Sequence, residues 1–120
     1  MSWLNALGLS AALALPSALL AEGYSVVDLG VTSSESDCMA QAESVLERYK
    51  DTLGASSVSS GTWVVYGWDM EPGDQDVVIT CVGSTSGEVE NRAVLVIHGA
   101  KSETERFTTR DVLKGYWQAY

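Results

Sequence analysis

The sequence of 120 residues is poor in the side chains that build catalytic and metal sites. It has one histidine, His98, and two cysteines, Cys38 and Cys81, without a C-x-x-C pair. One histidine and two cysteines that pair with each other exclude a zinc site of histidine and cysteine ligands. A hydrolase built on His98 and Cys38 lacks a cysteine signature, and one built on Ser84 or Ser86 lacks a nucleophile elbow. We therefore expect no catalytic residue, metal or cofactor, and a protein that is not an enzyme.

Positive charge is also scarce. The chain has 7 Lys and Arg against 16 Asp and Glu, all of them beyond Ala21, which gives a net charge of −9. Such a surface repels phosphate backbones and anionic lipid headgroups, so we expect no nucleic-acid partner and no membrane binding by the mature protein. A basic protein partner or a cationic small ligand fits this charge, although acidity also serves solubility alone.

Residues 1–21 have the pattern of a secretory signal peptide. An apolar stretch from Trp3 to Leu15 is broken by Pro16, and small residues lead to a predicted cleavage site after Ala21. The segment has no Lys or Arg at its start, so an uncleaved membrane anchor stays an alternative. We predict an exported protein, periplasmic or secreted, with a single small domain at residues 22–120.

The first half of this domain predicts a strand followed by a helix. Residues Tyr24 to Thr32 alternate, with Val31 and the other apolar side chains on one side. From Asp37 to Leu53, apolar residues recur at steps of three and four and form one helical stripe. Ser34, with an acidic residue three positions later, resembles the start of a capping box, and Gly54 fits the end of the helix.

Three further strands and a second helix are predicted in the rest of the chain. The strand segments are rich in β-branched and aromatic residues and are bounded by turn formers. They cover Thr62 to Met70, Val77 to Gly83 and Arg92 to Gly99. Their short connections favour antiparallel hairpins. Residues Ala55 to Gly61 are predicted as a loop, and the last helix is predicted from about Thr109, as its cap, to the end of the chain.

The order strand, helix, three strands, helix favours an α+β sandwich, in which two helices pack on an antiparallel four-stranded sheet. Trp63, Trp68 and Trp117 are expected in the core with the helical stripe. The strands at 77–83 and 92–99 are apolar on both faces, so part of the outer sheet face is expected to be covered.

The two cysteines are placed to pair. Cys38 lies on the apolar stripe of the first helix, and Cys81 shares a strand face with Val77 and Ile79. We predict a Cys38–Cys81 disulfide, whose loop of about 44 residues would stabilise the domain by about 4 kcal/mol. The alternative is a reactive thiol at a helix N-terminus, which the neighbouring Asp37 disfavours.

Acidic residues gather at the predicted hairpin turn after the second strand. They are Asp69, Glu71, Asp74 and Asp76. Oxygen ligands in a loop suit calcium, but this spacing misses the EF-hand pattern. We interpret the turn as solvated, or as an element that enters the cleft of a basic partner.

Tyr66 and Trp68 share one face of the second strand and form a candidate binding strip. If they are exposed, they suit binding of a glycan or of a protein anchor. If they are buried, they would stack under Tyr116 and Trp117, which is the structural alternative that we favour.

In outline, the layout resembles small exported bacterial domains that inhibit or escort other proteins, on size, charge and one disulfide. The resemblance implies an acidic binding or inhibitor module with one structural disulfide and an unidentified protein partner. A small-ligand binder with a pocket between sheet and helix is the alternative. An enzyme that uses Cys38 or His98 comes third.

Overall fold

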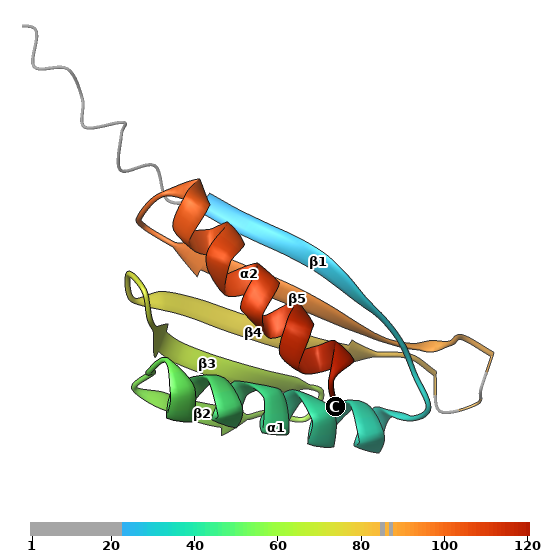
Figure 1. Ribbon diagram of the computed structural model, residues 1–120. Coiled ribbons are helices and arrows are strands. Elements are labelled where there is room, and N and C mark those ends of the chain that lie inside the picture. Colours follow the sequence, from blue (N-terminus) through green and yellow to red (C-terminus); the bar gives the residue numbers. More distant parts are fainter. Residues whose placement is uncertain (1–22, 85, 87) are drawn as a thin grey trace, which may run out of the picture.

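The computed structural model describes residues 23–84, 86 and 88–120, and the predicted signal peptide lies outside the described residues. Two helices pack on one face of a five-stranded sheet, which makes an α+β fold (Figure 1). The elements in chain order are β1 Gly23–Thr32, α1 Glu35–Thr52, β2 Ser57–Ser60, β3 Val64–Met70, β4 Gln75–Val82, β5 Asn91–Gly99 and α2 Glu103–Gln118. In the described part of the chain, no helix is long and apolar enough to cross a membrane.

The sheet is antiparallel throughout, with the strand order β1-β5-β4-β3-β2. The hairpins β3–β4 and β4–β5 agree with the predicted trio of strands. The prediction of four strands is wrong, because Ser57–Ser60 pairs with β3 where a loop was expected. Three of its four residues are serines, which have little strand propensity of their own. This edge strand therefore forms because it pairs with β3, and its own sequence does not predict a strand.

The start and end of α1 follow from local signals. The hydroxyl of Ser34 accepts a hydrogen bond from the backbone N–H of Asp37 at 3.0 Å, which confirms the predicted cap. After the helix, Gly54 adopts a φ of 106°, a conformation that glycine reaches without steric cost. The backbone N–H of Gly54 bonds to the carbonyl groups of Tyr49 and Lys50, so the last turn is satisfied.

The start of α2 was predicted too late. The helix begins at Glu103, and its cap is Ser102, whose hydroxyl accepts from the backbone N–H of Glu105 at 3.2 Å. Ser102 and Glu105 have the spacing of a capping box, which fixes the start upstream of the threonine-rich stretch. Thr109, expected as the cap, lies fully buried inside the helix.

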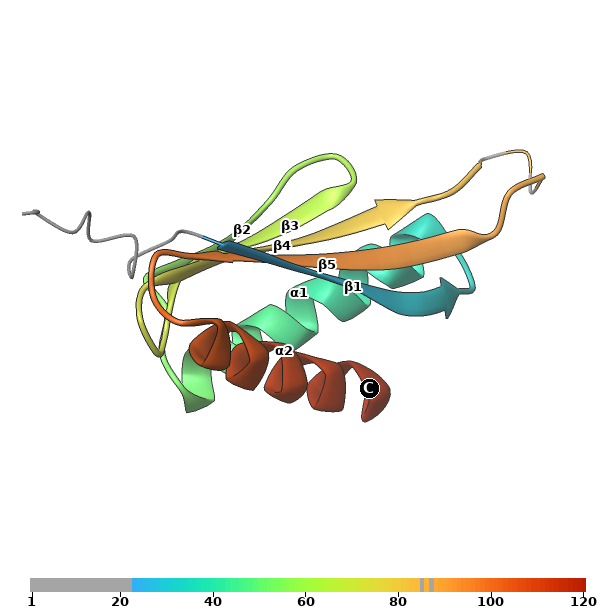
Figure 2. The same ribbon diagram turned by 90° about the horizontal axis from the view of Figure 1, so that it is seen from above.

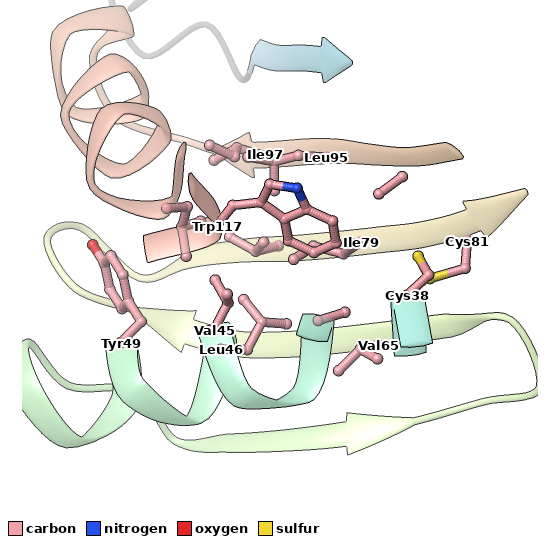
Figure 3. Close-up of a cluster of buried hydrophobic side chains, with 14 of the residues drawn as sticks. Cys38, Val45, Leu46, Tyr49, Val65, Ile79, Cys81, Leu95, Ile97 and Trp117 are labelled. Atoms are coloured by element: carbon pink, nitrogen blue, oxygen red, sulfur yellow. A yellow bond between two sulfur atoms is a disulfide. The ribbon is translucent and has the colours of Figure 1, made fainter. Parts of the chain in front are cut away.

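Both helices bury their apolar sides against the same face of the sheet (Figure 2). The core holds the face of β4 that Cys81 shares with Val77 and Ile79, as predicted, together with inner residues of β5 and the stripe of α1. Its large members include Leu46, Tyr49, Val65, Ile79, Leu95, Ile97 and Trp117 (Figure 3). Cys38 and Cys81 form the predicted disulfide there, with a Cα–Cα distance of 5.9 Å, and it ties α1 to β4.

Only one of the three tryptophans expected in the core is there. Trp117 of α2 is 7% exposed, whereas Trp63 is 51% and Trp68 is 40% exposed. On β3 the core positions belong to Val65 and Met70, Trp68 points to the other face of the sheet, and Trp63 precedes the strand at the end of the core.

A bulge in β1 overturns one further expectation. Between Asp28 and Gly30 the pairing with β5 shifts, and Gly30 has a φ of 99°. Leu29 packs against the core, but the shift turns Val31 to the solvent, where it is 56% exposed. A one-residue shift moves every following side chain to the other face, so simple alternation fails beyond this point.

Candidate functional site

The face of the sheet opposite the helices is uncovered by any described helix or strand, and we name it the open face (Figure 2). The register places its side chains in rows across the strands. One row joins Val26, Val96, Val78 and Tyr66 across β1, β5, β4 and β3. The apolar and aromatic members of the open face are Tyr24, Val26, Val31, Val64, Tyr66, Trp68, Val78, Val82, Val94 and Val96. The expectation that part of this face is covered is not met within the described chain.

Tyr66 and Trp68 stack on each other at the β3 side of the open face. Their ring centroids are 5.4 Å apart and their planes differ by 17°. The indole Nε1 of Trp68 donates a hydrogen bond to the hydroxyl of Ser59 on β2 at 2.9 Å. The edge strand therefore holds the indole in place while its ring stays partly exposed. The alternative that these rings stack under Tyr116 and Trp117 is wrong, because the helices lie on the other face.

Two of the four predicted acidic residues adjoin this aromatic pair. Asp69 lies in an irregularity of the β3–β4 pairing and has a φ of 50°. Its backbone N–H donates to a carboxylate oxygen of Asp76 at 3.2 Å, and its own carboxylate accepts from Ser56 at 2.7 Å. Asp76 points to the open face, since it pairs with His98 and precedes the buried Val77. Asp76 thus lies across the β3–β4 pairing from the end of the aromatic pair, and Asp69 follows Trp68 directly in the chain.

The other two acidic residues belong to the turn itself. The Glu71 carboxylate accepts from the backbone N–H of Gly73 at 3.3 Å, and its backbone N–H donates to the carbonyl of Gly54. Asp74 is exposed and has a φ of 55°. Glu71 is thus a turn-stabilising residue, and nothing else about Asp74 distinguishes it as a binding residue.

A buried polar cluster anchors this turn to both helices. The hydroxyl of Tyr49 on α1 donates to the carbonyl of Glu71 and lies 3.3 Å from the hydroxyl of Thr109 on α2. The side-chain amide of Gln75 donates to Thr109 at 2.7 Å and to the carbonyl of Pro72 at 2.6 Å. Burial raises the pKa of the Tyr49 phenol above its usual value of 10.0.

The β1 side of the open face carries its own polar groups. The ring of Tyr24 lies 4.7 Å from that of His98. Arg92 contacts Asp28 at 2.8 Å and Glu90 at 3.7 Å. A hydrogen bond from the backbone N–H of Gly30, together with the Arg92 side chain, holds the pKa of Asp28 below its usual value of 3.8.

Sequence reasoning missed a hollow of about 480 Å³ at the end of the sheet near the start of α1. The disulfide residue Cys81 and the indole of Trp63 line it, with Ser34 and Glu35 from the helix start and Asn91 from β5. No motif marks these positions, since they are far apart in the sequence and meet only through the topology. Trp63 gave no signal of the hollow either, because the sequence placed it in the core.

The residues considered for catalysis do not come together. Cys38 is in the disulfide and offers no thiol. His98 lies near the end of β5 opposite Asp76 at the start of β4, whereas Ser84 follows the end of β4, so roughly 25 Å of strand separates them. In the part of the chain that the structure describes, no group of three His, Cys, Asp or Glu side chains is placed to hold a metal.

Comparisons with known proteins add no assignment. No family model matches the chain, and neither the curated proteins nor the solved structures contain a match.

Proposed function

We propose that the protein is an exported binding module that engages another protein through the open face of its sheet. The observation that carries this proposal is the row of apolar and aromatic side chains that crosses the sheet without cover. A contiguous apolar surface of this extent on a soluble domain is typical of a protein interaction site.

The size of the open face suits such a role. Five strands about 4.8 Å apart and about six residues long give a flat area of roughly 480 Å². A standard interface buries about 800 Å² on each partner, so the face and its acidic rim together have the required order of size. Tyr66 and Trp68 are of the residue types that dominate interface energetics.

The rest of the molecule supports a rigid module. The Cys38–Cys81 disulfide joins the covering helix to the central strand, and the buried Tyr49 cluster fixes the β3–β4 turn. A preorganised surface loses little conformational entropy when it binds. A disulfide also suits the export that the N-terminal sequence predicts.

Two measurements test the proposal. The intact mass of the exported protein, with and without alkylation, is expected to correspond to a chain that begins at Glu22 and has no free thiol.

In a second experiment, the tagged protein is recovered from the compartment of the cells that produce it, beside the open-face variants Val96→Lys and Val26→Lys. Val26 is 67% exposed, so its replacement should leave the fold intact even if the central Val96→Lys does not.

The matched control is Leu53→Lys, which replaces a 47% exposed apolar side chain at the end of α1. We expect a partner that co-purifies at a fixed ratio with the original protein and the control, and that is lost from both open-face variants. Equal recovery of the partner by all four proteins would refute the assignment to the open face.

The hollow beside the disulfide favours a second candidate function, the binding of a small ligand. Its volume of about 480 Å³ falls within the range of known ligand pockets, and Trp63 supplies a ring on which a ligand can stack. A ligand of this site should raise the melting temperature in a saturable manner, and Trp63→Ala should abolish that rise. A rise that survives Trp63→Ala would place the ligand elsewhere.

A further inference from the structure

Charge is unevenly distributed over the two halves of the sheet. Between Asp51 and Asn91 the sequence has no lysine, arginine or histidine. This segment forms β2, β3 and β4 with their turns, and it holds Asp69, Asp76 and four other acidic residues. The cations lie on the helices, on β5 and in the short link before α2. The strands β2, β3 and β4 therefore bring acidic but no basic side chains to the open face, while His98 of β5 lies opposite Asp76 and Lys101 lies beside Gly73 in the β3–β4 turn.

The stacked aromatic pair lies within this acidic region. The Trp68 side chain is 40% exposed, and its ring is fixed in position by stacking on Tyr66 and by the hydrogen bond to Ser59. At the same strand end, the Asp76 carboxylate accepts from the Asp69 N–H, and the Asp69 carboxylate accepts from Ser56 of the neighbouring edge. An electron-rich ring beside carboxylates is the environment that a guanidinium group prefers, because it can stack on the ring and pair with the oxygens together.

We propose that the partner presents an arginine-bearing polypeptide segment to this end of the open face. The arginine guanidinium lies over the Tyr66–Trp68 pair and pairs with Asp76 and Asp69, while neighbouring apolar side chains of the segment cover the central valines. The inference rests on the proposed function and specifies the chemistry of its partner. Arginine is favoured over lysine because its planar group stacks on aromatic rings and binds carboxylates with two parallel hydrogen bonds.

A second copy of the chain fits this surface poorly. It carries the same net charge of −9 and the same acidic hairpin, which repel across a shared interface. In the described chain, Arg92 is the arginine on the open face, and Asp28 and Glu90 already hold its guanidinium. The other arginines, Arg48, Arg106 and Arg110, belong to the helices.

The test uses a capped peptide that alternates arginine and valine, and a twin in which citrulline replaces every arginine. Citrulline keeps the shape of the side chain and removes its charge. Binding is followed by the backbone amide shifts of the isotope-labelled protein and by the salt dependence of the dissociation constant. We expect saturable shifts centred on Tyr66, Trp68 and Asp76, binding about tenfold or more weaker for the citrulline peptide, and further weakening by salt.

Two variants localise the contact. Trp68→Ala removes the ring, and Asp76→Asn removes the charge while its oxygen can still accept from the Asp69 N–H. Each should weaken the arginine peptide severalfold. Phe107→Ala is the control, because Phe107 is an exposed ring on α2 that Arg110 covers. Its replacement should leave peptide binding unchanged.

Three results would overturn the inference. Equal affinity for both peptides would show that the guanidinium group does not contribute to binding. Peptide binding that survives the combined substitutions Trp68→Ala and Asp76→Asn would place the binding site elsewhere. Dimers in sedimentation that Val96→Lys dissociates would make a second copy the occupant. If partner recovery is lost with Val96→Lys but the peptides bind equally, the proposed function stands and only the arginine inference fails.

Discussion

Trp68 and Trp117 lie on opposite faces of the same sheet, one 40% exposed and the other 7% exposed. Trp117 closes the core between α2 and the inner sheet face, and the Gln41 side chain donates to its backbone carbonyl at 3.0 Å. The Trp68 side chain stacks on Tyr66 and donates to Ser59, and the Trp68 carbonyl accepts from the backbone N–H of Ser56 at 2.9 Å. The two tryptophans therefore have separate roles, one in stability and the other on the candidate binding surface.

The first prediction contrasts these two residues. Trp117→Ala should lower the free energy of unfolding by about 3–5 kcal/mol, because it opens a cavity in the core. Trp68→Ala should cost less than about 1 kcal/mol, since its ring is held at the surface. Urea denaturation followed by circular dichroism measures both. Equal losses for the two variants would contradict the division between core and open face.

The second prediction concerns the disulfide. The double variant Cys38→Ala/Cys81→Ala should have a free energy of unfolding that is lower by about 4 kcal/mol. The reason is that the disulfide joins residues 43 positions apart and so closes a long loop in the unfolded chain. For a domain of this size that loss lowers the melting temperature by roughly 15–30 °C. Reduction of the unmodified protein should produce a similar loss. An unchanged melting temperature would show that the bond contributes nothing to stability.

The sequence predicts the cysteine pair well because both cysteines follow strict periodicities. Cys38 lies on the apolar stripe of a helix, and Cys81 lies on one face of an alternating strand. The direction in which each side chain points is therefore set by local geometry. The pairing then needs only that this helix covers this strand. The same alternation correctly grouped Val77 and Ile79 with Cys81 on one face of β4.

Alternation cannot say which sheet face the helices cover, and that is why the tryptophans were misplaced. The alternation along β3 places Tyr66 and Trp68 on the same face, as observed. It does not say which of the two faces of this strand is turned to the core. The bulge at Gly30 and the pairing of Ser57–Ser60 are also set by neighbouring strands. The hollow at Trp63 and the contact between Asp69 and Asp76 arise from turns that no periodicity encodes.

The third prediction uses two glycines with opposite surroundings. Gly115 is exposed within α2, and an added Cβ would meet nothing within 4 Å. Gly115→Ala should therefore raise the free energy of unfolding by about 1 kcal/mol through helix propensity. Gly54→Ala should lower it by about 1–2 kcal/mol, because its φ of 106° strains any residue with a Cβ. Thermal unfolding of both variants checks the two signs, and a destabilised Gly115→Ala would mean that α2 needs flexibility there.

The fourth prediction concerns the alkaline stability of the Tyr49 cluster. Burial raises the pKa of Tyr49 above 10.0, so the unfolded chain releases this proton at a lower pH than the folded protein does. The folded state binds more protons in that range, and its stability should therefore fall as the pH rises above about 10. Below that pH the contribution is fully present.

Tyr49→Phe removes this titration and the hydrogen bond to the Glu71 carbonyl. At pH 7 it should be less stable than the original protein by about 1 kcal/mol, since a buried carbonyl loses its donor. Above pH 10 its stability should decline less steeply, because the phenol with the raised pKa is gone. Tyr120→Phe, which removes a 64% exposed phenol, is the control for the loss of one tyrosine. Urea unfolding at each pH gives the slopes, and parallel curves for Tyr49→Phe and Tyr120→Phe would show that the buried phenol does not govern alkaline unfolding.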